Sequence, residues 1–251
     1  MAGIFLLSGL VILIAKIKFV PETIGMIFKY AFTPNALIGG GIGAALKTAI
    51  SQGAKRGLFS NEAGMGSTPH AHAQANVEKP HDQGVAAMVG VFIDTFVVLT
   101  MTALVVITCL YTGNGPLANL SGNAYLAATA GEAAVVSKTS AMQMAVSSVF
   151  GNSLGNSFVA ICLLFFAFST IIGWNFFGKV NMQYLFKNDK VAVVVYSIIA
   201  VGFIFLGSLL KNDLVWELTD FFNYLMVIPN AIALFALGKV VAKNAKNKKN
   251  K

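Results

Sequence analysis

Six apolar runs of about twenty residues constrain this chain more than any other feature. They cover residues 4–20, 36–58, 84–111, 157–177, 191–210 and 216–239. Because a helix rises about 1.5 Å per residue, runs of this length can cross roughly 30 Å of hydrocarbon. Only 11% of the residues are charged, whereas a soluble domain carries about 25%. The sequence therefore predicts an all-α polytopic membrane protein.

Lysines indicate on which side of the membrane each loop lies. Three lysines follow the fourth run and five lie in the tail 240–251, whereas the loop 112–140 holds only Lys138. Since positively charged loops stay in the cytoplasm, we expect a cytoplasmic C-terminus, an external loop 112–140 and a location in the plasma membrane. Lys16 and Lys18 oppose this orientation unless their side chains extend to the interface. A nucleic-acid-binding tail is the other interpretation of the last lysines, and a cytoplasmic end is the simpler one.

Three smaller features also bear on the membrane prediction. Cys109 and Cys162 lie inside apolar runs, so we expect them to pack within the membrane and not to form a disulfide. Residues 1–15 have no basic n-region and no small-residue cleavage site, which favours a span over a signal peptide. Apolar residues at helical intervals in 21–33 predict a short amphipathic helix on the outer surface.

A polar stretch, RGLFSNEAGMGSTPHAHAQA at 56–75, interrupts the chain after the second run. Gly57 is suited to end a helix, because glycine adopts the left-handed conformation at low cost. Ser67 or Thr68 is suited to cap a new helix, and Pro69 fits its first turn. The stretch therefore predicts that one helix stops and another starts.

A break at 59–67 would leave backbone groups free, which is tolerated only in packed protein or beside a wet cavity. Freed carbonyls suit a small cation and half-helix N-termini suit a carboxylate, so a zwitterionic amino acid matches both. The alternative is a plain cytoplasmic loop, with Lys55 and Arg56 marking the inner boundary. Residues 39–43 form a second candidate break, although small residues there are also typical of close helix packing.

Two acidic residues lie beside or within the apolar runs. Asp94 belongs to the third run, where a charged group is costly and usually faces a partner or a cavity. Its candidate partners are Lys47, Lys55 and Arg56. An inner-leaflet position is the alternative for Asp94, and Glu62 allows the same two interpretations.

The fourth run contains Ser169 and Thr170, followed one turn later by Trp174. Hydroxyl oxygens are ligands that sodium accepts, although serine and threonine also bond within their own helix. Trp174 could wall a small pocket or lie at the interface. His70 and His72 are two residues apart and point to different faces of a helix, so they make a poor zinc site. Proton coupling through them is a weaker alternative.

Three strings, RGLFSNEAGMGS, GVFIDT and FAFSTIIGW, occur here in an order that resembles the alanine or glycine:cation symporter family, the sodium:alanine symporters. The resemblance extends over essentially the whole chain. It implies the second half of a five-plus-five inverted-repeat fold like that of the leucine transporter. It also implies sodium-coupled symport of a small neutral amino acid, alanine or glycine.

The resemblance further implies roles for individual residues. FSNEAG corresponds to the broken sixth span of the family and FAFST to its eighth span. The residues that would border the amino acid are Phe59, Asn61, Ala63 and Gly64, with Trp174 closing the pocket. The residues that would supply oxygens to sodium are Thr170 and Ser169.

The chain also departs from the family pattern. Family members are nearly twice this length, and the runs here correspond to spans five to ten. The missing N-terminal spans would supply the rest of the sodium shell and much of the carboxylate site. The loop 112–140 is longer than usual for the family, and TPHAHAQA replaces a run of small residues.

These departures lead to two hypotheses. The first is the C-terminal half of a symporter, truncated before the first spans and unable to transport alone. The second is an accessory membrane subunit that binds a partner and transports nothing. No nucleotide loop, nucleophile motif or haem pair supports an enzyme, and sodium is expected as a coupling ion without any other cofactor.

Overall fold

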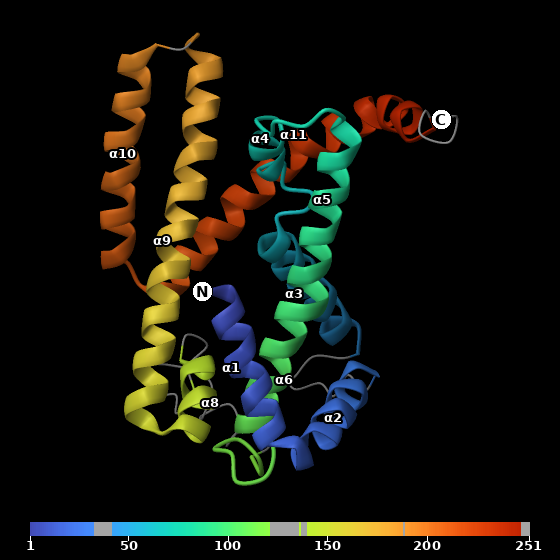
Figure 1. Cartoon of the computed structure of the whole chain (residues 1–251), viewed down its shortest axis with the longest axis vertical. Coiled ribbons are helices and arrows are strands. Elements are labelled where there is room, and N and C mark those ends of the chain that lie inside the picture. The colour runs from blue at the N-terminus through green and yellow to red at the C-terminus, as the bar shows by residue number, and fades with distance from the viewer. Residues whose placement is uncertain (33–41, 121–135, 137–139, 188, 247–251) are drawn as a thin grey trace. The chain divides into compact units, whose positions relative to one another are not determined.

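The computed structural model describes residues 1–32, 42–120, 136, 140–187 and 189–246, and its regular structure in these ranges is helical throughout (Figure 1). Four helical stretches are long and apolar enough to cross a membrane: Pro80–Leu110, Asn152–Leu185, Lys190–Leu209 and Asn212–Lys243. A fifth arises if the bent pair Ala2–Ala15 and Ile17–Lys29 counts as one span. The prediction of an all-α, multi-pass membrane protein is confirmed. Of the six predicted spans, the second, 36–58, begins outside the described residues.

The described residues form two compact units. The first comprises Met1–Ser51 with Thr95–Phe168, and the second comprises Gln52–Asp94 with Ser169–Lys251. Helices of the first unit are α1 (Ala2–Ala15), α2 (Val20–Phe32), the beginning of α3 (Ile42–Asn61), α6 (Thr100–Leu110), α8 (Ala141–Phe150) and the beginning of α9 (Asn152–Leu185). Helices of the second are the end of α3 (Ile42–Asn61), α4 (Thr68–His72), α5 (Pro80–Phe92), the rest of α9, α10 (Lys190–Leu209) and α11 (Asn212–Lys246).

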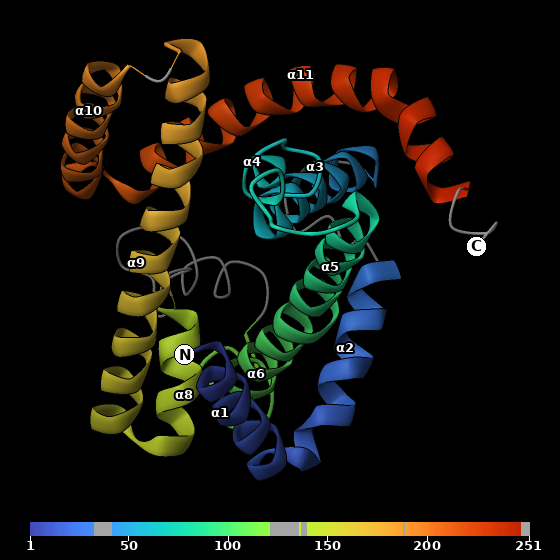
Figure 2. The ribbon, with the colours of Figure 1, turned by 45° about the horizontal axis from the view of Figure 1, so that its top comes forward.

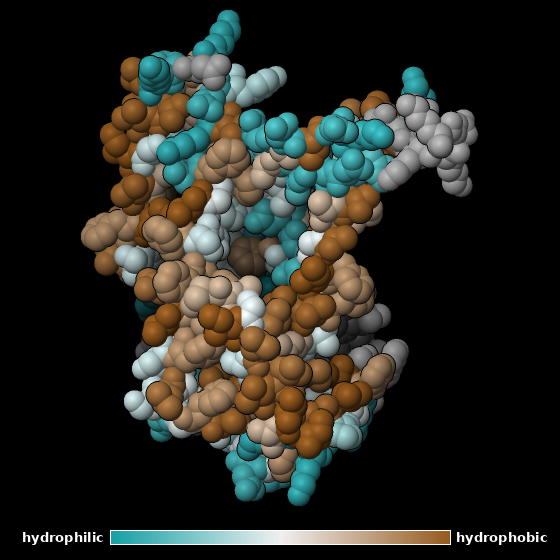
Figure 3. Space-filling model, in the orientation of Figure 1, coloured by the Kyte–Doolittle hydropathy of each residue, from teal (hydrophilic) through white to brown (hydrophobic). Residues whose placement is uncertain are grey.

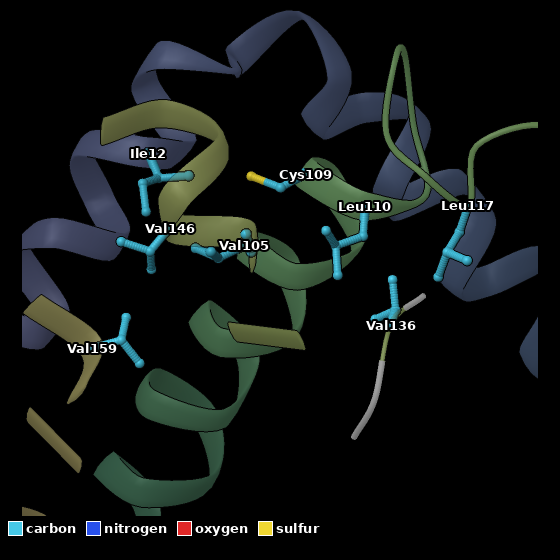
Figure 4. Close-up of a cluster of buried hydrophobic side chains, with 9 residues drawn as sticks. Ile12, Val105, Cys109, Leu110, Leu117, Val136, Val146 and Val159 are labelled. Carbon is cyan, nitrogen blue, oxygen red and sulfur yellow. The ribbon is translucent and has the colours of Figure 1, made fainter. Parts of the chain in front are cut away.

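The first unit has its own apolar core, shown in Figure 4. Ile12 of α1 and Val105 of α6 are fully buried, and Val146 of α8 and Val159 of α9 lie in the same cluster. Cys109 joins this core, as expected for a packing residue. In a membrane, where lipid is as apolar as these side chains, helices associate mainly through van der Waals packing, so close contacts between these four helices hold the unit together.

The chain bends sharply after α1, where the sequence predicts a single span over 4–20. Helix α1 ends at Ala15, and the helical segment Ile17–Lys29 is inclined to it by 77°. Pro21 explains the restart, because proline has no N–H to donate and fits the first turn of a new helix. The amphipathic segment predicted at 21–33 therefore lies in α2, which begins at Val20.

Two buried hydroxyls join α2 to α6 within the first unit. The Thr23 and Thr108 hydroxyl oxygens lie 2.9 Å apart, and both residues are almost fully buried. A hydroxyl left without a partner in such a site costs about 1–3 kcal/mol, whereas replacing both groups with apolar ones of the same shape is nearly neutral. The pair thus lets two polar residues occupy an apolar interface at little net cost.

We expect Thr23→Val to lower the free energy of unfolding by about 1–3 kcal/mol, because it strands the Thr108 hydroxyl. The double variant with Thr108→Val should recover most of that loss. Denaturant titration of the chain in detergent micelles, followed by circular dichroism, measures both. A double variant as unstable as the sum of the two single variants would contradict the pairing.

Helices α9 and α10 run antiparallel and lie side by side in Figures 1 and 2. Their outward surface is apolar: Val194, Ile198 and Phe205 are each more than half exposed. Figure 3 shows hydrophobic side chains over this surface and hydrophilic ones near the α9–α10 connection. Exposed apolar surface of this extent is typical of contact with lipid or with another protein.

Candidate functional site

The helical chain is interrupted between Asn61, the last residue of α3, and Thr68, the first of α4. Gly57 lies inside α3 and does not cap it, so the predicted helix end is wrong by four residues. The left-handed positions come later, at Glu62 (φ 54°), Gly64 (φ 94°) and Gly66 (φ 84°). The side chain of Asn61 helps to turn the chain, because its amide oxygen accepts a hydrogen bond from the Ala63 N–H at 3.0 Å.

Contacts within the interruption close it into a compact turn. The Ser67 hydroxyl donates to the Glu62 carboxylate at 2.6 Å, and the Met65 N–H donates to the Glu62 carbonyl at 3.2 Å. Met65 and Ser67 are almost fully buried. Glu62 is therefore bonded to two other residues of the interruption, Met65 and Ser67. We call residues 62–67 the break from here on.

Helix α11 contacts the break directly, and Figure 2 shows it running alongside α3 and α4. The Asn230 side-chain amide donates to the Gly64 carbonyl at 2.9 Å. Asn230 follows Pro229, which lies inside α11 and cannot donate to the carbonyl one turn earlier. The position in α11 that lacks a backbone hydrogen bond thus lies next to the irregular backbone of the break.

A cavity of about 550 Å³ lies beside the break, inside the second unit. Met65, Gly66 and Ser67 of the break line it, together with His70 of α4. The remaining walls come from α9, α10 and α11: Trp174, Phe177, Gly178, Asn181, Tyr196, Met226, Pro229 and Asn230. Aromatic rings with a few amide and hydroxyl groups are typical of a site for a small molecule.

The α9 wall of this cavity follows one helical stripe. Trp174, Gly178 and Asn181 are three or four residues apart, so they share a face, and the rings of Trp174 and Phe177 are 5.8 Å apart in an edge-on arrangement. Thr170 precedes Trp174 by one turn on this stripe. Ser169 is offset by about 100° around the helix, so of the two predicted sodium ligands Thr170 is better aligned with the cavity.

His70 connects the break to α9. Its Nδ1 lies 2.9 Å from the Ser67 carbonyl oxygen, and its Nε2 lies 3.2 Å from the amide oxygen of Asn181. His72 has a separate partner, since its Nδ1 lies 2.7 Å from the Gln83 amide nitrogen. The two histidines thus contact different groups, as their spacing predicts.

A second set of contacts joins α3 to α11 ahead of the break. The Arg56 guanidinium pairs with the Asp220 carboxylate at 3.4 Å and lies 4.7 Å from the centre of the Trp216 ring. Phe59 packs edge-on against the same ring at 5.3 Å. Because the Arg56 side chain is 46% exposed, its ion pair is worth at most about 1 kcal/mol. The cation–π contact of the exposed guanidinium is of similar size, about 0.5–1 kcal/mol.

Asp94 has a different partner from those predicted. Its carboxylate accepts a hydrogen bond from the Ser60 hydroxyl at 2.9 Å, whereas Lys55 and Arg56 pair with Asp220. The side chain of Lys47 lies outside the described residues. Asp94 belongs to a π-helical segment, Ile93–Leu99, within the span Pro80–Leu110. Single π-helical turns inside α-helices often occur at functional sites.

The residues predicted to border an amino acid are only partly brought together. Trp174 lines the cavity, and Asn61, Ala63 and Gly64 lie in or next to the break that forms another wall. Phe59 instead contacts Trp216. These placements leave the roles of all five residues as predictions.

Several residues that line the cavity are not predicted from the sequence. Asn181 and Tyr196 are unremarkable in the sequence, and the sequence suggests His70 only as a metal ligand or proton carrier. Asn230 had a recognisable signal, because an amide directly after a proline is unusual in an apolar run. An amide at membrane depth needs a partner, and here that partner is the break.

Comparison with known proteins identifies relatives along the whole chain. The model of the sodium:alanine symporter family matches residues 1–251. The sodium/alanine symporter AgcS of Methanococcus maripaludis is 37% identical over 246 residues, which is 98% of this chain and 49% of that protein. The probable sodium/glutamine symporter GlnT of Bacillus subtilis is 38% identical over 230 residues, 92% of this chain and 43% of that protein.

An uncharacterized transporter of Haemophilus influenzae is 36% identical over 247 residues, 98% of this chain and 50% of that protein. The chain therefore spans about half the length of the curated relatives it matches. The family predicted from RGLFSNEAGMGS, GVFIDT and FAFSTIIGW is the one found. A multi-pass helical architecture, an interrupted helix beside a cavity and the match over residues 1–251 lead to one conclusion: the chain belongs to the sodium:alanine symporter family.

Proposed function

We propose that this chain forms part of a sodium-coupled symporter for a small neutral amino acid, alanine or glycine. The observation that carries the proposal is the break at 62–67, which forms one wall of a cavity that Trp174 also lines. Names of the relatives support it, since AgcS is a sodium/alanine symporter. In this proposal the plasma membrane holds the protein with its C-terminus in the cytoplasm.

The chemistry of the break supports an amino-acid ligand. A helix of 20 residues, α3, ends at the break with its carbonyl groups and partial negative charge. That end suits the ammonium group of the ligand or a sodium ion, and the Glu62 carboxylate adds negative charge next to it. Trp174 and Phe177 provide apolar surface for a methyl-sized side chain.

The ligand carboxylate and the rest of the sodium shell call for further groups. We propose that residues which the relatives carry outside the matched segment complete the site, in the arrangement of two inverted repeats of five spans. Thr170, with Ser169, would supply oxygens to sodium from α9. Sodium would then favour the conformation that holds the amino acid, with a coupling free energy of typically 1–3 kcal/mol.

Uptake by proteoliposomes tests the proposal. We expect a chimera in which this chain replaces the matched segment of AgcS to take up labelled alanine or glycine in sodium and not in choline. The 251-residue chain alone should show no sodium-dependent uptake, because it supplies only part of the site. Empty vesicles and the parent symporter are the controls.

Each outcome bears on a different part of the proposal. Equal uptake in sodium and choline would exclude sodium coupling. Sodium-dependent uptake of glutamine without alanine or glycine would exclude the small substrate. Transport by the chain alone would show that its site is complete without the residues of the relatives.

A further inference from the structure

Asn230 is the polar side chain through which α11 contacts the break. Its amide N–H donates to the Gly64 carbonyl at 2.9 Å, across 166 residues of sequence. That carbonyl belongs to a residue with φ of 94°, outside any helix. Because Gly64 lies outside any helix, no helical turn supplies a donor to its carbonyl, and the Asn230 amide supplies one from a neighbouring helix.

Gly66 makes this approach possible. A Cβ atom at Gly66 would lie 2.9–3.0 Å from the Cβ, Cγ and amide oxygen of Asn230. The Cβ of Asn230 is fixed by the backbone of α11 and cannot rotate away, so the backbone on one side of the contact would have to shift to admit a larger residue. Gly66 and Asn230 therefore form a close contact that fixes the distance between α11 and the break.

Pro229 adds a property that an ordinary helical position would lack. Proline inside a helix removes one backbone hydrogen bond and its ring displaces the preceding turn, so helices kink there. Asn230 is thus attached to the point of α11 where the helix axis can change direction most easily. A change of direction at Pro229 would move the amide that holds the Gly64 carbonyl.

We propose that Asn230 is a positioning residue for the ligand site, and that it couples the direction of α11 to the shape of the break. The identity of the ligand rests on the proposed function, whereas the contact between Asn230 and the break does not. Asn230 holds the carbonyl of Gly64 and limits the space at Gly66, and it acts on the ligand through these two backbone positions.

The matched substitutions are Asn230→Asp and Asn223→Asp. Aspartate keeps the volume of asparagine and loses the donor, so N230D leaves the Gly64 carbonyl facing a carboxylate. Asn223 lies two turns earlier on the same helix and serves as the chemical control. In the AgcS chimera, N230D should raise the alanine KM about tenfold with a smaller effect on the maximal rate, and N223D should leave both near the parent values.

A second measurement needs no transport. The chain has two tryptophans, and Trp216→Phe leaves Trp174 as the reporter of the cavity that Asn230 also lines. In that background, in lipid nanodiscs, N230D should increase acrylamide quenching of Trp174 while N223D does not. This quenching comparison tests the role of Asn230 even if the chimera fails to transport. Failure to transport would count against the proposed function and not against the role of Asn230.

A double-substitution cycle separates positioning from general stability. Gly66→Ala should displace Asn230, so adding Asn230→Ala to it should change Trp174 quenching much less than N230A does in the parent. Equal quenching in N230D and N223D, or fully additive effects of G66A and N230A, would overturn the proposal. Larger effects of N230D than of N223D on both Trp174 quenching and the alanine KM would support it.

Discussion

Replacing Gly64 with valine should abolish alanine uptake by the AgcS chimera, whereas replacing Gly57 with alanine should leave uptake intact. Gly64 has φ of 94°, which a β-branched residue adopts only with strain, and a Cβ there would lie 3.2 Å from the Leu58 side chain. We expect the valine to lower the free energy of unfolding by about 2–3 kcal/mol. It should also displace the carbonyl that Asn230 holds.

Gly57 is the matched control for this experiment. It lies inside α3, and a Cβ atom added there would meet nothing within 4 Å. Alanine in a helix interior is more stable than glycine by roughly 0.5–1 kcal/mol, so Gly57→Ala should raise the stability slightly. Uptake assays and thermal unfolding in detergent measure both variants. Strong destabilisation by G57A would mean that the helix ends at Gly57, as the sequence alone suggests.

The contrast between these two glycines shows how far local sequence reasoning reaches. Both are glycines, which can end a helix at low cost, and the sequence predicts a helix end at the first of them. The actual end is set by Asn61, whose side chain bonds to the Ala63 N–H, and by the left-handed Glu62. Glycine can end a helix at either position, so local propensity alone does not choose between Gly57 and Gly64.

Apolar periodicity locates several helices well. The run 191–210 corresponds to α10, Lys190–Leu209, because its length and composition suit a span without help from neighbours. The bend after α1 is different, since the run 4–20 is apolar on both sides of Lys16. Apolar composition says how much chain can lie in lipid, and it carries no information about the direction of the helix axis.

Contacts between distant helices are the part that the sequence does not determine. Three basic residues were candidate partners for Asp94, and two of them instead pair with Asp220, more than 160 residues away along the chain. The Asn230 contact with Gly64 is of the same kind. Such pairs depend on how helices pack, which is decided by many weak contacts summed over whole faces. The cavity residues on α10 and α11 were missed for this reason.

Replacing Thr170 with alanine in the AgcS chimera should raise the sodium concentration for half-maximal alanine uptake about tenfold, a loss typical of one polar ligand to a charged group. Thr170 precedes Trp174 by one turn on the stripe of α9 that lines the cavity. Its hydroxyl is an oxygen ligand of the kind that hard cations accept. The relative uptake of alanine and glycine should stay unchanged, because T170A alters none of the residues proposed to contact the amino-acid side chain.

Two matched variants decide whether Thr170 acts on sodium or only on the helix. Thr102→Ala removes a hydroxyl that donates to the Val98 carbonyl of the same span at 2.8 Å, so it should leave the sodium dependence unchanged. Ser169→Ala should have a smaller effect than T170A, since Ser169 is turned away from the stripe. If T170A and T102A shift the sodium dependence equally, a hydroxyl inside a span matters for helix stability alone. A specific shift in T170A would instead place the coupling ion one turn from Trp174, so that sodium and amino acid would share the α9 wall of a single site.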